Sequence, residues 1–160
     1  ALVDSKFIKE HIHVDGKIID VIPTSQLNLE EKYYQKIPYE NPKISIDNLK
    51  EDYFGKIFGT RSGDKGGCAN LGVWAKSQEA YSFLFDFLTV KKLKELLPDL
   101  EKFEIDRFEL PNIYSLNFYV HGILQDGVSS STRMDGQAKS LGEYLRAKKI
   151  NFPEQLLKQI

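Results

Sequence analysis

The ten residues from Arg61 to Asn70 (RSGDKGGCAN) hold a denser set of chemical groups than any other stretch of the sequence. Two cations, one carboxylate and one amide stand beside three glycines there. Glycine lets main-chain N–H groups approach a ligand closely, and arginine and lysine attract carboxylates and phosphates. The stretch therefore predicts a glycine-rich loop that binds an anion through Arg61, Lys65 and the backbone near Gly66 and Gly67.

Two familiar phosphate-binding motifs do not fit this stretch. A Walker loop has lysine followed by serine or threonine after its second glycine, whereas Lys65 precedes Gly66 and Cys68 comes later. A dinucleotide-binding fingerprint has glycines that open a helix in a βαβ unit, whereas the flanking residues here predict two strands. A simple turn, in which Asp64 caps backbone amides and pairs with Arg61 or Lys65, explains the composition equally well. Both interpretations stay open at this point.

Polar residues farther along the chain form a second constellation, which consists of Asn112, Asn117, Arg133, Asp135, Gln137 and Lys139. They fall near the expected ends of elements, where loops supply binding groups. If a helix begins at Asp135, its free N–H groups and Arg133 form a second anion position, but Asp135 acting only as a helix cap is the alternative. The expected ligand-binding set is Arg61, Ser62, Gly63, Asp64, Lys65, Gly66, Gly67, Asn70, Asn112, Asn117, Arg133 and Asp135.

Nucleophilic catalysis and metal binding have little support in the sequence. Cys68 stands in a cationic stretch, which lowers the pKa of a thiol, but no base can be assigned to it. His121 is the only histidine after residue 50, and nothing in the sequence places it beside Cys68. His11 and His13 lack the third ligand that a zinc site requires. We therefore expect no metal and no cofactor, and we assign no catalytic residue.

The composition fits a soluble protein with one domain. The 160 residues include 22 basic and 23 acidic side chains, mixed along the chain, which argues against a nucleic-acid partner. Charges interrupt every apolar run well before the roughly 20 residues that a membrane span requires, and no secretory signal pattern opens the sequence. A single cysteine agrees with a reducing compartment, so we expect a cytoplasmic protein without a membrane partner.

The pattern of residue types along the chain changes near residue 50. Residues 1–50 predict a hairpin, with strands over His11–Val14 and Lys17–Ile22 around the turn Asp15-Gly16. A short helix is expected over Leu29–Gln35, and the two prolines within Ile37–Asn48 favour an extended arm. We therefore expect an N-terminal extension over residues 1–50 and a compact domain over residues 51–160.

Strands and helices are expected to alternate after residue 50. Strands are predicted over Phe54–Thr60, Ala69–Ala75, Phe103–Leu110 and Tyr114–Val120. Helices are predicted over Gln78–Leu88 with Ser77 as N-cap, over Val90–Leu97 with Thr89 as N-cap, and from Asp135 through Leu145. Helices gathered on one face of a mostly antiparallel sheet make an α+β two-layer sandwich.

Several separated motifs resemble the C-terminal domain of the acyclic terpene utilisation (AtuA-like) family. They are the strings at Arg61–Gly66, Glu109–Asn112, Leu116–Phe118, Asp135–Lys139 and Leu141–Arg146. The likeness covers about two-thirds of the chain, from residue 53 to residue 157, and its motifs occur in the same order as in the family. The resemblance implies a ferredoxin-like fold for this part of the chain.

The resemblance also implies a metabolic context. Genes of family members lie near those for acyl-coenzyme A carboxylation in the catabolism of branched terpenoids, and this domain follows a larger N-terminal domain or occurs as a separate short protein. We therefore expect the domain to bind an acyl-coenzyme A or a carboxylate and to complete a site with a larger partner chain. A non-catalytic module that forms a homo-oligomer is the alternative, because such sandwiches leave one sheet face uncovered. An enzyme active alone is least favoured, because no acid, base and nucleophile set emerges.

Overall fold

The computed structural model describes residues 7–21 and 39–158, which belong to two compact units, Ala1–Pro38 and Tyr39–Ile160. In the first unit, strands β1 (Glu10–Val14) and β2 (Lys17–Val21) form an antiparallel hairpin. Its two turn residues, Asp15 and Gly16, both have positive φ, as a tight two-residue turn requires. The predicted hairpin is confirmed, while the helix expected over Leu29–Gln35 lies outside the described residues.

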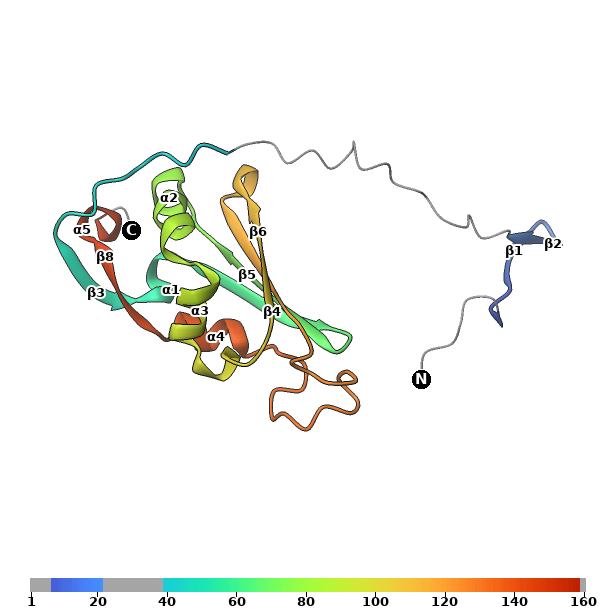
Figure 1. The fold of residues 1–160 in the computed structure, drawn as a ribbon. Coiled ribbons are helices and arrows are strands. Elements are labelled where there is room, and N and C mark those ends of the chain that lie inside the picture. Colours follow the sequence, from blue (N-terminus) through green and yellow to red (C-terminus); the bar gives the residue numbers. More distant parts are fainter. Residues whose placement is uncertain (1–6, 22–38, 159–160) are drawn as a thin grey trace. The chain divides into compact units, whose positions relative to one another are not determined.

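A four-stranded antiparallel sheet is the centre of the second unit (Figure 1). Its strands, in the order β4-β5-β7-β6, are β4 (Gly59–Lys65), β5 (Cys68–Trp74), β7 (Ser115–Val120) and β6 (Ile105–Leu110). Every second residue of β5 and β7 is fully buried, so these two central strands direct one face into the core. The strands predicted around Ala69–Ala75, Phe103–Leu110 and Tyr114–Val120 are confirmed.

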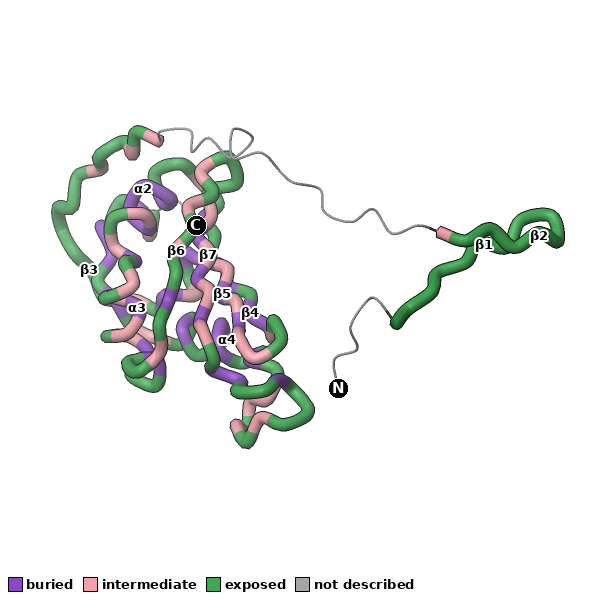
Figure 2. The backbone as a smooth tube through the Cα atoms, turned by 45° about the vertical axis from the view of Figure 1, so that its right-hand side comes forward, coloured by how far each residue is buried: buried purple, intermediate pink, exposed green. Residues whose placement is uncertain are grey.

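The described helices that contact this sheet cover its core-facing side (Figure 1). They are α2 (Gln78–Phe87), α3 (Val90–Leu96) and α4 (Leu141–Arg146). The expected N-caps form: the Ser77 hydroxyl accepts from the Ala80 N–H at 3.2 Å, and the Thr89 hydroxyl accepts from the Lys92 N–H at 3.1 Å. The buried parts of the chain, purple in Figure 2, run through these helices and the strands beneath them.

A second, two-stranded sheet packs against the same core through Ile150 and Phe152. Strand β3 (Leu49–Tyr53) pairs with β8 (Lys149–Pro153), and the short helices α1 (Phe54–Ile57) and α5 (Glu154–Leu157) follow these strands. Two 3₁₀ turns, η3 (Pro98–Leu100) and η4 (Pro111–Ile113), complete the described elements. None of the helices in the described part of the chain has the length and apolar character that a membrane crossing requires.

Two predicted elements are wrong. The strand expected over Phe54–Thr60 begins only at Gly59, because Phe54, Ile57 and Phe58 are all buried from a single helical turn that the Phe58 N–H closes onto the Phe54 carbonyl. The helix expected from Asp135 begins only at Leu141. Ala138 stands in the left-handed region with φ of 52°, which interrupts a right-handed helix.

The connectivity of the second unit explains its architecture. If α2 and α3 are counted as one helical connection, the order from β4 to α4 is ββαββα. Reading from β5 and placing β4 after α4 gives βαββαβ, the ferredoxin-like order. The predicted α+β two-layer sandwich, with helices on one face of an antiparallel sheet, is therefore confirmed, and the other sheet face carries none of the described helices.

Candidate functional site

The RSGDKGG stretch forms most of strand β4 and a two-residue turn, so the glycine-rich loop expected over the whole stretch is wrong, while the antiparallel pairing of the two strands that flank the turn is confirmed. Arg61–Lys65 pair with β5, and only Gly66 and Gly67 lie between the paired residues Lys65 and Cys68. The turn packs closely: the Leu124 N–H donates to the Gly67 carbonyl at 2.9 Å. A Cβ atom at Gly67 would lie 2.0 Å from the Gln125 carbonyl oxygen. Glycine is required here by packing against residues 124 and 125.

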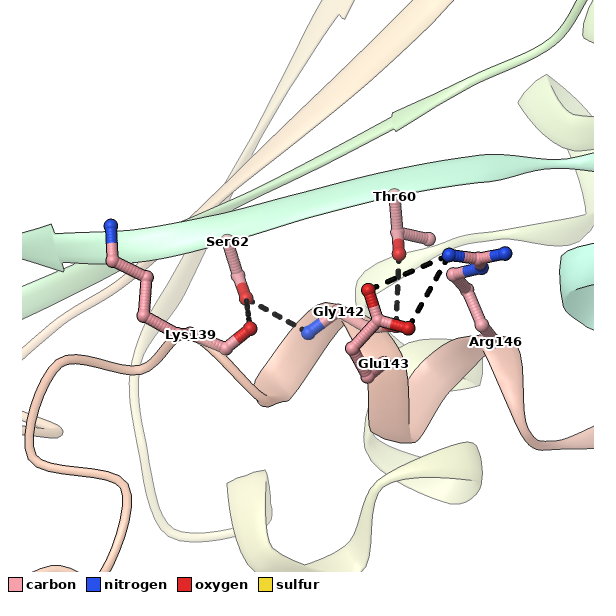
Figure 3. A network of polar contacts seen from close by, with 6 residues as sticks. All are labelled: Thr60, Ser62, Lys139, Gly142, Glu143 and Arg146. Atoms are coloured by element: carbon pink, nitrogen blue, oxygen red, sulfur yellow. Dashed lines mark hydrogen bonds and ion pairs between the residues drawn. The ribbon is translucent and has the colours of Figure 1, made fainter.

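Side chains alternate along β4, and Thr60 and Ser62 point toward α4 (Figure 3). The buried Ser62 hydroxyl accepts from the Gly142 N–H at 2.9 Å and donates to the Lys139 carbonyl at 3.1 Å. The buried Thr60 hydroxyl donates to the Gly142 carbonyl at 2.9 Å. Both residues therefore fix Lys139 and the first turn of α4 against the edge of the sheet.

The odd-numbered residues of β4, Arg61, Gly63 and Lys65, lie on the open sheet face. The Lys139 side chain extends toward β4 (Figure 3). Its ammonium nitrogen lies 3.2 Å from the position of a Cβ atom at Gly63. Since two residues span about 6.6 Å of a strand, the backbone positions of Arg61 and Lys65 are about 13 Å apart, and the Lys139 ammonium lies at Gly63, midway between them. We call Arg61, Lys139 and Lys65 the cation row.

Two asparagines extend the polar surface beside the cation row. Asn70 pairs directly with Gly63, and Asn117 pairs with Gly72, which lies opposite Arg61. The Asn70 amide donates to the Asn117 side-chain oxygen at 3.2 Å. Gly63 and Gly72 have no side chains, so no bulky group separates the asparagine amides from the cations on the open face.

A hollow of about 250 Å³ adjoins the cation row at the edge of β4, lined by Thr60, Arg61, Ser62, Lys139, Gly142 and Glu143. The Glu143 carboxylate is paired with Arg146 at 3.3 Å. The Arg61 guanidinium forms no hydrogen bond or ion pair with any residue that the structure describes. The hollow thus contains a cation that is available to an external anion.

The simple-turn interpretation of the stretch does not fit the geometry. The Lys65 ammonium donates to the Asp64 carbonyl oxygen at 2.8 Å, not to its carboxylate. Within residues 7–21 and 39–158, the Asp64 carboxylate pairs with neither Arg61 nor Lys65. The interpretation in which Asp64 pairs with Arg61 or Lys65 is therefore wrong for this part of the chain.

The structure separates the second constellation. Asn112 lies in η4, beyond the end of the sheet where Leu110 pairs with Ser115, while the turn at Gly66 is at the opposite end. Arg133 and Asp135 line a different pocket, of about 370 Å³, together with Asp99. Neither Asn112 nor Arg133 is part of the cation row.

Asp135 caps the start of α4 from a distance. Its carboxylate accepts from the Lys139 N–H at 2.8 Å and from the Ser140 N–H and hydroxyl at 3.0 and 2.7 Å. The second anion position, which required a helix that begins at Asp135, is therefore wrong. Sequence reasoning placed Lys139 in the same constellation but gave no signal that it reaches β4.

A small polar cluster surrounds Cys68 on the same sheet face. The Cys68 sulfur accepts from the Gly122 N–H at 3.4 Å, and its hydrogen bond with Tyr119 raises the pKa of that tyrosine. His121 bonds Asp106 at 2.8 Å and packs edge-on against Tyr119. No Cys68–His121 contact is among those of the described residues, and these residues hold no group of three or more potential metal ligands.

Comparison with known proteins gives one positive result. The model of a family described as the AtuA ferredoxin-like domain matches residues 54–151, which is more than half of the chain. The match begins in α1, ends in β8 and includes every strand of the four-stranded sheet. The comparisons with curated proteins and with solved structures give no match.

Proposed function

The chain belongs to the AtuA ferredoxin-like domain family, and we propose that its cation row binds an anionic small molecule, either an acyl-coenzyme A or a carboxylate. The supporting observation is the placement of the Lys139 ammonium at Gly63, between Arg61 and Lys65 on one strand face. A single carboxylate is held by one arginine fork, whereas a row whose backbone positions span about 13 Å suits a ligand with several separated anionic groups. The phosphates of coenzyme A are such groups.

Each member of the row has a distinct role in this proposal. The planar Arg61 guanidinium binds two oxygens of one anionic group at the hollow beside α4. Lys139 and Lys65 act as point charges farther along the strand, and Asn70 and Asn117 donate hydrogen bonds from the neighbouring strands. Because this sheet face is open, the part of the ligand beyond the cation row stays accessible to a larger partner chain, which completes the site.

Calorimetric titration with coenzyme A, acetyl-coenzyme A and acetate tests this proposal. We expect saturable binding of both coenzyme A compounds, weakened at least about tenfold by Arg61→Ala and by Lys139→Ala, since hydrogen bonds to charged groups contribute about 1.5–3 kcal/mol. The matched control is Lys91→Ala, an exposed lysine on α3. Equal affinity of Arg61→Ala, Lys139→Ala and Lys91→Ala would refute the assignment of the site.

A second candidate, an assembly module, has its own supporting observation. The open face carries exposed large apolar side chains at the end away from the turn, among them Trp74, Phe108 and Leu110. Such groups favour contact between copies or with another chain. Mass measurement by light scattering tests it: a stable oligomer that Phe108→Glu dissociates supports assembly through this face, and a monomer contradicts homo-oligomerisation.

A further inference from the structure

An apolar groove of about 500 Å³ runs along α2, on a surface that shares no lining residue with the cation row. Its lining consists of Lys43, Ile44, Ile46, Leu49, Phe83, Asp86, Phe87 and Asn151. Small-molecule sites typically have volumes of about 300–1,000 Å³, mostly apolar walls and a few polar groups. The groove has these features, and neither the motifs nor the proposed function uses it.

The groove exists because the segment before β3 is held at separate points. The Asn41 amide donates to the Ser82 carbonyl, and the Ser82 hydroxyl donates to the Pro42 carbonyl, which ties this segment to α2. Farther on, the Gln155 amide donates to the Ser45 carbonyl at 3.0 Å. Between these attachments the chain passes over the end of α2, and Lys43 and Ile44 become walls of the groove.

The floor of the groove is continuous with the hydrophobic core. Phe83 is buried and stacks on Phe87, with ring centroids 5.1 Å apart and an interplanar angle of 15°. On the walls, Ile46 is 60% exposed and Leu49 is 54% exposed. Two large aliphatic side chains beside an aromatic floor provide a surface that an aliphatic chain would remove from water.

Two charged residues of the groove, Lys43 and Asp86, indicate which polar head group a ligand would carry. The Lys43 ammonium forms no hydrogen bond or ion pair within the described part of the chain, so its charge is available to a ligand. Asp86 lines the same groove and repels an anion at its own position. From the apolar walls and this charge arrangement, we propose that the groove binds the aliphatic chain of a carboxylic acid, with the carboxylate beside Lys43.

Titration with octanoate, decanoate and dodecanoate, below their micellar concentrations, tests the binding of the chain. We expect the affinity to rise about two- to fourfold for each added methylene, because burial of a methylene contributes about 0.8 kcal/mol. Ile46→Asp places a charge in the groove and is expected to weaken dodecanoate binding more than about tenfold. Its matched control is Ile113→Asp, because Ile113 is 65% exposed and lies in η4, outside the groove.

Two further variants test the head group. Lys43→Gln is expected to weaken dodecanoate binding several-fold and to leave the binding of neutral dodecanol unchanged, while Asp86→Asn strengthens dodecanoate binding. Equal affinities of Ile46→Asp and Ile113→Asp for dodecanoate, or affinities independent of chain length, would overturn the groove as the site. Unchanged dodecanoate binding by Lys43→Gln would overturn the position of the carboxylate. Arg61→Ala serves as a separate control, because it affects the cation row alone.

Discussion

The ammonium nitrogen of Lys139 lies 3.2 Å from the position where a side chain at Gly63 would place its Cβ atom. Gly63 does not have a positive φ, so its backbone conformation is open to any residue. The glycine is explained by access instead: its missing side chain leaves room for a cation that arrives from a residue 76 positions later in the chain. The cation row therefore depends on Gly63, because the Lys139 ammonium lies where a side chain at residue 63 would otherwise be.

Replacement of Gly63 by alanine is expected to weaken anion binding without unfolding the domain. The new Cβ atom meets only the flexible end of Lys139, which moves away, so the free energy of unfolding should change by less than about 1 kcal/mol. Gly72→Ala is the matched control, because its Cβ atom makes an ordinary 3.6 Å contact with the Arg61 carbonyl and displaces no cation. Calorimetry with coenzyme A on both variants checks this, and equal affinities would contradict it.

Gly59→Ala is expected to destabilise the domain by about 1–3 kcal/mol, because overpacking forces neighbouring groups to shift. The added Cβ atom would lie 2.2 Å from a ring carbon of Trp74, whose side chain covers this glycine. Trp74 is the only tryptophan in the sequence, so its fluorescence reports the displacement directly. Urea unfolding followed by fluorescence checks both effects, and an unchanged emission spectrum with unchanged stability would exclude the close packing.

Loss of the Ser62 hydroxyl should also be costly. Ser62→Ala removes the acceptor of the Gly142 N–H and the donor to the Lys139 carbonyl, in a buried setting. An unsatisfied buried group costs about 1–3 kcal/mol, and we expect a loss of unfolding free energy in that range. Ser115→Ala, whose exposed hydroxyl bonds the nearby Ile113 carbonyl, should change stability by less than half as much in the same denaturation experiment.

Local signals in the sequence predicted the elements that depend on local interactions. The helices after Ser77 and Thr89 follow from their caps and from apolar residues at helical spacing, and β7 follows from the apolar residues at alternate positions of its sequence. The pairing of β3 with β8 could not be predicted in this way. Leu49 lies opposite Pro153, about a hundred residues later, and β3 presents mostly exposed charged and polar side chains without a buried face.

The candidate site likewise combines residues that a local motif reveals with one residue that no local pattern reveals. Arg61 and Lys65 stand in a motif that is visible in the sequence, although their strand conformation was mistaken for a loop because three glycines occur nearby. Lys139 becomes part of the site only through tertiary contacts, when the Ser62 and Thr60 hydroxyls bind the backbone at the start of α4. No local pattern around Lys139 encodes that approach.

The buried Tyr81 should make the domain sensitive to alkali. Burial raises the pKa of Tyr81 from 10.0 to about 12, and its hydroxyl has no hydrogen-bond partner among the described residues. Since the folded state resists deprotonation, this contribution to stability is complete below pH 10 and is lost as the pH rises from 10 to 12. Tyr81→Phe should therefore retain more of its neutral-pH stability at pH 11 than the wild type does. Tyr53→Phe, at an exposed tyrosine, is the control in urea unfolding at both pH values.

Asp135 connects the stability of α4 to the position of the cation row. Asp135→Ala removes three hydrogen bonds, two of them to the backbone N–H groups of Lys139 and Ser140, and should cost about 1 kcal/mol, as for the loss of a helix cap. Because the same peptide carries the Lys139 side chain to Gly63, coenzyme A binding should weaken by several-fold at a temperature where the variant remains folded. Asp135→Asn keeps one acceptor oxygen, whereas the carboxylate accepts from Lys139 with one oxygen and from Ser140 with the other, so it should restore only part of both properties. If Asp135→Ala lowers the thermal stability and leaves the affinity for coenzyme A unchanged, the start of α4 does not position Lys139 for binding.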